Sequence, residues 1–93
     1  PETVRRYSRE IAEYLLAQGV KAIVVACNTA TAHALDALRR ECPVPVIGVV
    51  EPGARAAVAA TRGGTIGVLG TVGTVRSGAY ERAIRALAPS APV

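Results

Sequence analysis

The sequence contains no Phe, Trp or Met, and its three tyrosines are its only aromatic residues. Apolar residues nevertheless make up 51% of the 93 positions, and most of them are Ala and Val. This composition argues against a disordered chain and suits helices packed closely on a sheet. Because a chain of this length buries only about 60% of its unfolded surface, we expect one small domain, or part of a larger one.

Long apolar runs and clustered charge are also lacking. No run approaches the roughly 20 residues of a membrane span, and no signal-peptide pattern is visible. The formal net charge is +4, but the arginines are scattered and lack interleaved aromatics, which disfavours the alternative of a nucleic-acid-binding module. Two cysteines in a chain of this kind fit a reducing compartment. We therefore expect a cytoplasmic protein with neither a membrane nor a nucleic-acid partner.

Apolar periodicity predicts four helices. In the first, Val4, Tyr7, Ile11, Tyr14 and Leu15 recur on one face, and Gly19 is placed to end it. The others are expected over about 29–41, over about 52–61, and from 72 or 75 to 87. Prolines at 43 and 45 and glycines at 63 and 64 separate these segments.

Between the helices lie three short apolar runs, KAIVVA (21–26), VIGVV (46–50) and TIGVLG (65–70). Such runs are typical of strands covered on both faces. The predicted order is α-β-α-β-α-β-α, an α/β fold with a three-stranded parallel sheet and right-handed crossovers. Three strands make a small sheet, and the chain opens directly on a helix, so both ends are expected to be cuts through a longer protein.

In an open parallel sheet, ligands bind beyond the carboxyl ends of the strands. That rule selects three segments: Cys27-Asn28-Thr29, Glu51-Pro52-Gly53 and Thr71 to Thr74. In the last, the glycines of GVLGTVGT match neither a dinucleotide fingerprint nor a phosphate-binding P-loop, and close strand–helix packing explains them better. By the strand-end rule, we still expect the hydroxyls of Thr71 and Thr74 to point toward the ligand edge.

Cys27 ends a strand where a helix begins. Unpaired N–H groups and the helix dipole favour a thiolate there and form a cradle for a carboxylate. Asn28 or Thr29 either caps the helix or turns toward a ligand. The alternative, a buried Cys27 beside a simple cap, carries equal weight on position alone. Cys42, which precedes Pro43, is interpreted as structural.

His33 and Glu51 are interpreted conservatively. His33 follows one turn after Thr29, and a surface or supporting role is favoured over direct participation. Glu51 is favoured as an acidic residue at a helix start. With a single histidine, the sequence offers neither a metal cluster nor a Cys-His-Asp arrangement, so we expect no metal.

Three segments in order, VVACNTATA, VPVIGVVEPGARAA and TIGVLGTVGTVRSGAY, resemble the glutamate racemases of the aspartate/glutamate racemase superfamily. The resemblance covers essentially the whole chain. It implies a cofactor-independent isomerase that makes D-glutamate for peptidoglycan, and hence for the cell wall and cell shape. Two cysteines would face opposite sides of the substrate α-carbon. Cys27 matches one of them, and Asn28, Thr29, Thr71 and Thr74 match substrate contacts.

Other family motifs are absent: the N-terminal Asp-Ser-Gly loop, the Pro-Tyr-Gly segment, and the Cys-Thr-His motif with the second cysteine. The resemblance therefore implies the middle of a two-domain enzyme, with residues 1–50 ending the first domain and 51–93 starting the second. We expect this chain alone to be inactive and the full-length protein to form homo-oligomers. Two alternatives stay open: an aspartate racemase or another superfamily member, and a non-catalytic α/β module that binds carboxylate or phosphate.

Overall fold

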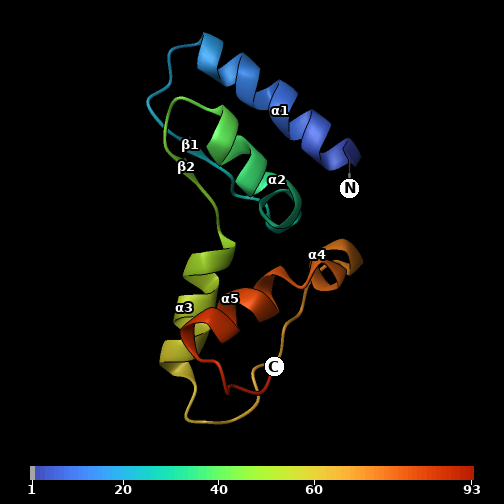
Figure 1. Ribbon diagram of the computed structural model, residues 1–93, viewed down its shortest axis with the longest axis vertical. Coiled ribbons are helices and arrows are strands. Elements are labelled where there is room, and N and C mark those ends of the chain that lie inside the picture. Colours follow the sequence, from blue (N-terminus) through green and yellow to red (C-terminus); the bar gives the residue numbers. More distant parts are fainter. Residues whose placement is uncertain (1) are drawn as a thin grey trace.

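The computed structural model describes residues 2–93, which form an elongated body of 46 × 25 × 17 Å. The elements in chain order are α1 (Glu2–Ala17), β1 (Ile23–Val24), α2 (Asn28–Glu41), β2 (Val46–Ile47), α3 (Val50–Ala60), α4 (Val72–Ser77) and α5 (Ala79–Leu87). Helix α1 and helix α2 lie with the two strands at one end of this body, and α3 packs against α5 at the other (Figure 1). Helix α4 contacts α2 and so joins the two halves.

The main core lies in the first half, where α2 packs against α1 and the strands. Its members are small or branched aliphatic residues, which allows the close approach of helix and strand that the Ala- and Val-rich composition predicts. They are Ala12, Ile23, Ala34, Leu35, Leu38 and Val46.

Helix α1 presents a different face from the expected one. Val4 and Leu15 are half-buried as predicted, but Tyr7, Ile11 and Tyr14 are exposed. Contact with α2 runs instead through the side that carries the small, buried Ala12, because a small side chain lets two helix backbones come close.

An ion pair also ties α1 to α2. Arg9 donates from Nε and Nη2 to the carboxylate of Glu41, at 2.9 and 3.2 Å. The hydrogen bond and the charge of Glu41 raise the pKa of the Arg9 guanidinium above its ordinary value.

The two strands pair in parallel, with Ile23 opposite Val46 and Val24 opposite Ile47. The ladder continues at both ends, since Ile23 N donates to Pro45 O and Val25 N to Ile47 O. Ile23 and Val46 are buried, whereas Val24 and Ile47 are 64% and 49% exposed. The prediction of strands covered on both faces is therefore wrong for the residues that the structure describes.

The predicted third strand is also wrong, so within residues 2–93 the parallel sheet has two strands and not three. Residues 65–70 have no regular secondary structure, and their backbone does not join the β1–β2 ladder. Ile66 N donates to Pro92 O at 2.8 Å, and Leu69 is fully exposed. A strand is defined by its neighbour, and the described residues place no strand beside this segment.

The last predicted helix divides in two. Gly78 adopts a left-handed conformation, with φ of 68°, and lies at once after α4 and before α5. Glycine adopts this conformation without the steric cost that a Cβ brings. Gly19, with φ of 80°, likewise follows the end of α1, as predicted.

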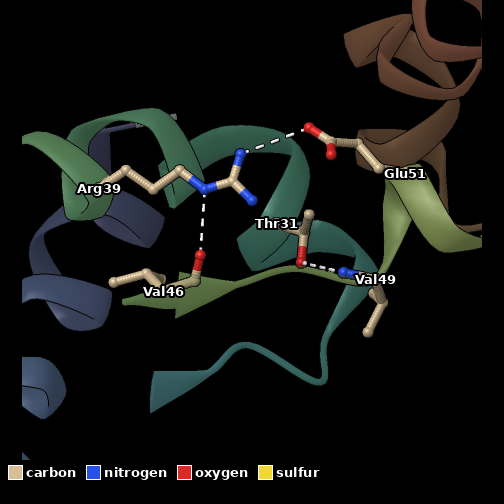
Figure 2. A network of polar contacts seen from close by, with 5 residues as sticks. All are labelled: Thr31, Arg39, Val46, Val49 and Glu51. Atoms are coloured by element: carbon tan, nitrogen blue, oxygen red, sulfur yellow. Dashed lines mark hydrogen bonds and ion pairs between the residues drawn. The ribbon is translucent and has the colours of Figure 1, made fainter. Parts of the chain in front are cut away.

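The passage from β2 to α3 is held by polar contacts from α2 (Figure 2). Arg39 donates to Val46 O at 3.0 Å and pairs with Glu51 at 3.3 Å. The Thr31 hydroxyl donates to Val25 O and accepts a long hydrogen bond from Val49 N. These contacts thus hold the chain to α2 both along the end of β2 and at the start of α3. None of the helices over residues 2–93 is both long and apolar enough to cross a membrane.

Candidate active site

Cys27 is the N-cap of α2. Its backbone is extended, with φ of −123° and ψ of 125°, and its carbonyl accepts the first helical hydrogen bond, from Thr31 N at 2.9 Å. The sulfur accepts from Ala30 N at 3.5 Å, and the residue is exposed. Sulfur is a weaker acceptor than the oxygens usually found at this position. Helix stability alone therefore does not account for a cysteine here, and an accessible thiol beside free N–H groups is suited to proton transfer.

Three threonine hydroxyls meet next to this helix start. Thr29 Oγ1 lies 3.3 Å from Thr71 Oγ1 and 3.2 Å from Thr74 Oγ1, and Thr71 Oγ1 donates to Thr74 Oγ1 at 3.0 Å. Thr71 also caps α4 by accepting from Thr74 N at 3.3 Å. Thr74 is 2% exposed, whereas Thr71 is exposed. The cluster thus joins the starts of α2 and α4, with the exposed Thr71 at its outer side.

Asn28 makes a contact that the sequence did not predict. Its Oδ1 accepts a hydrogen bond from the phenol of Tyr80 on α5 at 2.6 Å. Periodicity gave no reason to single out Tyr80; the available signal was that it is one of only three aromatic residues. This bond brings a third element, after α2 and α4, to the edge of the site.

Other candidates lie elsewhere. Cys42 is the C-cap of α2, half-buried, and so at the far end of the helix from Cys27. Glu51 lies in the first turn of α3, and its carboxylate forms an ion pair with Arg39. This position agrees with its interpretation as an acidic residue at a helix start. The interpretation of Cys27 as a buried apolar residue is wrong, since the residue is exposed.

His33 is half-buried, and its Nε2 is fully buried with no hydrogen-bond partner among residues 2–93. The atom faces the backbone of α4, where a Cβ on Gly73 would lie 3.7 Å away. His33 is therefore a packing residue between α2 and α4, next to the threonine cluster rather than in it. No group of three or more His, Cys, Asp or Glu side chains in the described chain is arranged to hold a metal ion.

Comparison with known proteins gives a consistent result. The family model described as Asp/Glu/Hydantoin racemase matches residues 2–92. The glutamate racemase of Geobacter metallireducens is 56% identical over 93 residues, which are all of this chain and 34% of that protein.

Solved structures agree. Glutamate racemase RacE1 from Bacillus anthracis superposes with a TM-score of 0.94 at 49% identity, over 99% of this chain and 35% of that one. The Francisella tularensis glutamate racemase, solved in complex with D-glutamate, gives 0.88 at 33% identity, over 99% of this chain and 34% of that one. The chain thus spans about a third of the length of the relatives that it matches.

Proposed function

We propose, from the premise that this chain belongs to the Asp/Glu/hydantoin racemase family, that it forms one side of the active site of a glutamate racemase. The observation that carries the proposal is the exposed thiol of Cys27 at the start of α2, beside the hydroxyls of Thr29, Thr71 and Thr74. Relatives with the same segment are named glutamate racemases, and one of them has been solved with D-glutamate.

The proposed reaction is a proton exchange at the substrate α-carbon. The Cys27 thiolate takes the α-proton of one enantiomer, and the electron pair stays on carbon, where the adjacent carboxylate delocalises it. A second thiol on the opposite face gives a proton to that carbon, which inverts the configuration. No electrons leave the substrate, so the proton exchange requires no oxidant or reductant, and we propose that it proceeds without a cofactor.

Charge develops on the substrate carboxylate as the proton leaves, and fixed donors aimed at that charge lower the barrier. The proposed donors to this charge are the Thr29 hydroxyl and the free N–H groups of α2, while the Asn28 side chain binds the carboxylate equally before and during proton transfer. Thr71 is proposed to contact the substrate as an acceptor, because its hydroxyl proton is donated to Thr74 Oγ1. In this arrangement Thr74 holds the other two threonines in position, because it is 2% exposed and hydrogen bonded to both of them.

The second thiol is proposed to come from residues outside this chain, so the 93 residues alone should not racemise glutamate. Cys42 is the only other cysteine in the sequence, and it stands at the opposite end of α2. We further propose that residues 1–50 and 51–93 belong to two successive domains. The separate packing of α1 with α2 and of α3 with α5 supports a boundary near Val50.

The proposed setting is a cytoplasmic homo-oligomer that supplies D-glutamate for peptidoglycan. An aspartate racemase has the same chemistry and differs in the depth of its pocket. A carboxylate-binding module would share the site but would not exchange a proton. Comparing D-glutamate with D-aspartate as substrates separates the first alternative, and α-proton exchange separates the second.

The test is a chimera in which residues 1–93 replace the matching segment of the Bacillus anthracis RacE1 racemase, to which they superpose over 99% of their length. We expect it to convert L-glutamate to D-glutamate, and to exchange the α-proton with deuterium in D₂O. Cys27→Ser should abolish both signals, whereas Cys42→Ser should retain them. A chimera in which Cys27→Ser retains the parental rate would contradict the proposal.

A further inference from the structure

The hydrogen bond between Tyr80 and Asn28 spans 52 positions of sequence and links α5 to the first residue of α2. Its oxygens lie 2.6 Å apart. That distance falls within the usual range of O–H···O bonds, about 2.5–3.0 Å, and lies below the usual N–H···O range, which begins near 2.7 Å. The separation therefore supports the amide oxygen, and not the nitrogen, as the atom that faces the phenol.

The phenol is itself held in place by the backbone of α3. A Cβ built on Gly53 would lie 3.1 Å from Cε1 and 3.4 Å from the hydroxyl of Tyr80. The ring therefore rests against a position without a side chain, and a Cβ added there would force the ring or the backbone to give way by a few tenths of an ångström. The Glu51-Pro52-Gly53 segment, selected in the sequence by its place at a strand end, thus reaches the site through Tyr80.

Fixing Oδ1 determines what Asn28 can offer to a ligand. An amide carries an acceptor oxygen and a nitrogen with two donors. With the oxygen engaged by Tyr80, the exposed side of Asn28 presents N–H donors, for which residues 2–93 supply no acceptor. Donors match a carboxylate oxygen and reject an ammonium group, which is itself a donor.

We propose that Tyr80 is a positioning residue that holds Asn28 in a donor-only orientation, so that Asn28 binds a carboxylate and excludes an ammonium group. In this proposal Gly53 is the position against which the Tyr80 ring packs. The proposal rests on the proposed function for the identity of the substrate. It does not need proton transfer to occur, since it concerns recognition alone.

The direct test uses the 93-residue chain with ¹⁵N-labelled asparagine, because Asn28 is its single asparagine. Glutarate, which has carboxylates and no ammonium, should shift the Asn28 side-chain N–H signals, and propylammonium should not. Tyr80→Phe should weaken glutarate binding about fivefold, the ratio expected for the loss of one ordinary hydrogen bond. Tyr14→Phe, at an exposed position on α1, is the matched control and should change nothing.

A kinetic test in the RacE1 chimera separates positioning from a general structural effect. Tyr80→Phe should raise KM for glutamate about fivefold and leave kcat within about twofold, as expected when binding is lost equally in the ground and transition states. Gly53→Ala should change KM in the same direction. A variant that merely unfolds part of the protein would lower kcat instead and leave KM unchanged.

Three results would overturn the proposal: no shift with glutarate in the wild-type chain, a shift with propylammonium alone, or Tyr80→Phe binding glutarate as the wild type does. If the chimera fails to racemise while glutarate shifts Asn28 in a Tyr80-dependent manner, the proposed function fails and the recognition inference stands. If the chimera racemises glutamate and Tyr80→Phe leaves KM unaltered, the proposed function stands and the recognition inference fails.

Discussion

Cys27 and Cys42 cap opposite ends of the same helix, α2. Fifteen residues at about 1.5 Å each place them roughly 22 Å apart along its axis. A disulfide requires Cα atoms within about 7 Å, so the two cannot form a bridge without unfolding the helix. The same distance prevents them from facing one substrate carbon from both sides. Any two-cysteine mechanism in this family member thus needs a thiol other than Cys42.

The first prediction concerns the reactivity of these two thiols. Cys27 is exposed at a helix start, whereas Cys42 is half-buried, so iodoacetamide should label Cys27 at least several-fold faster. Mass spectrometry of the partly labelled chain measures the ratio. Cys27→Ser should remove the fast phase, and Cys42→Ser should retain it. Faster labelling at Cys42, or an internal disulfide after mild oxidation, would be inconsistent with the intact helix between them.

Protection by ligand is the second prediction. If α2 begins at a carboxylate site, D-glutamate should slow the labelling of Cys27 and leave the labelling of Cys42 unchanged. Cys42 serves as the internal control, since any general effect of added salt alters both rates. Equal slowing of the two, or none at saturating D-glutamate, would argue that the site beside Cys27 holds no amino acid in this chain.

The third prediction tests the threonine cluster. Thr74 is 2% exposed and bonds Thr29 and Thr71 through its hydroxyl. Thr74→Val keeps the shape but removes the buried hydroxyl that bonds both partners, so the free energy of unfolding should fall by about 0.5–1.5 kcal/mol for each hydrogen bond lost. Thr3→Val, at an exposed position on α1, should stay within about 0.5 kcal/mol. Urea denaturation followed by circular dichroism compares the two.

A Thr74→Val variant as stable as the Thr3→Val control would mean that the three hydroxyls do not contact one another in solution. The hydrogen bonds that link the start of α2 to the start of α4 would then not form in solution.

A close approach between β2 and α2 gives the fourth prediction. A Cβ on Gly48 would stand 2.7 Å from both Leu35 Cδ2 and Thr31 Cγ2, so Gly48→Ala forces these side chains or the strand to move. Overpacking of this kind costs about 1–3 kcal/mol of unfolding free energy. Gly64→Ala is the control, because its added Cβ meets nothing within 4 Å. Equal stability of the two variants would contradict the described packing.

Much of the fold was predictable because its signals are local. Helix periodicity, glycine and proline breaks and short apolar runs depend on neighbouring residues, and they placed α1, α2 and α3 and both observed strands. The break at Gly78 was not predicted because a glycine within an apolar pattern is compatible with a continuous helix, whereas its left-handed backbone ends one helix and starts another. The exposed face of α1 was missed for another reason: periodicity shows that a helix has an apolar side but not which neighbour covers it.

Part of the candidate site could also be predicted from the sequence. Strand-end position selected Cys27, Thr29, Thr71 and Thr74, and the structure brings the three threonine hydroxyls together. Whether they contact a substrate stays a prediction. Tyr80 was missed because its role depends on a contact across 52 residues, which no local pattern encodes.

The fifth prediction returns to the strand that did not form. A strand at 65–70 would bury Leu69, whereas the structure leaves that side chain 103% exposed. Leu69→Ala should therefore change the unfolding free energy of this chain by less than about 0.5 kcal/mol. Leu38→Ala is the contrast: at 4% exposure it leaves a core cavity, and it should cost about 2–5 kcal/mol, enough to abolish a cooperative transition.

Urea denaturation of both variants, beside the wild type, measures this difference. A loss above about 1 kcal/mol in Leu69→Ala would show that this segment is packed in solution, contrary to the described exposure of Leu69. If Leu69→Ala leaves the unfolding free energy unchanged while Leu38→Ala lowers it, the result would explain why the apolar run at 65–70 does not form the predicted strand. An apolar run becomes a strand only when a neighbouring strand pairs with it, and residues 2–93 place no such strand beside this one.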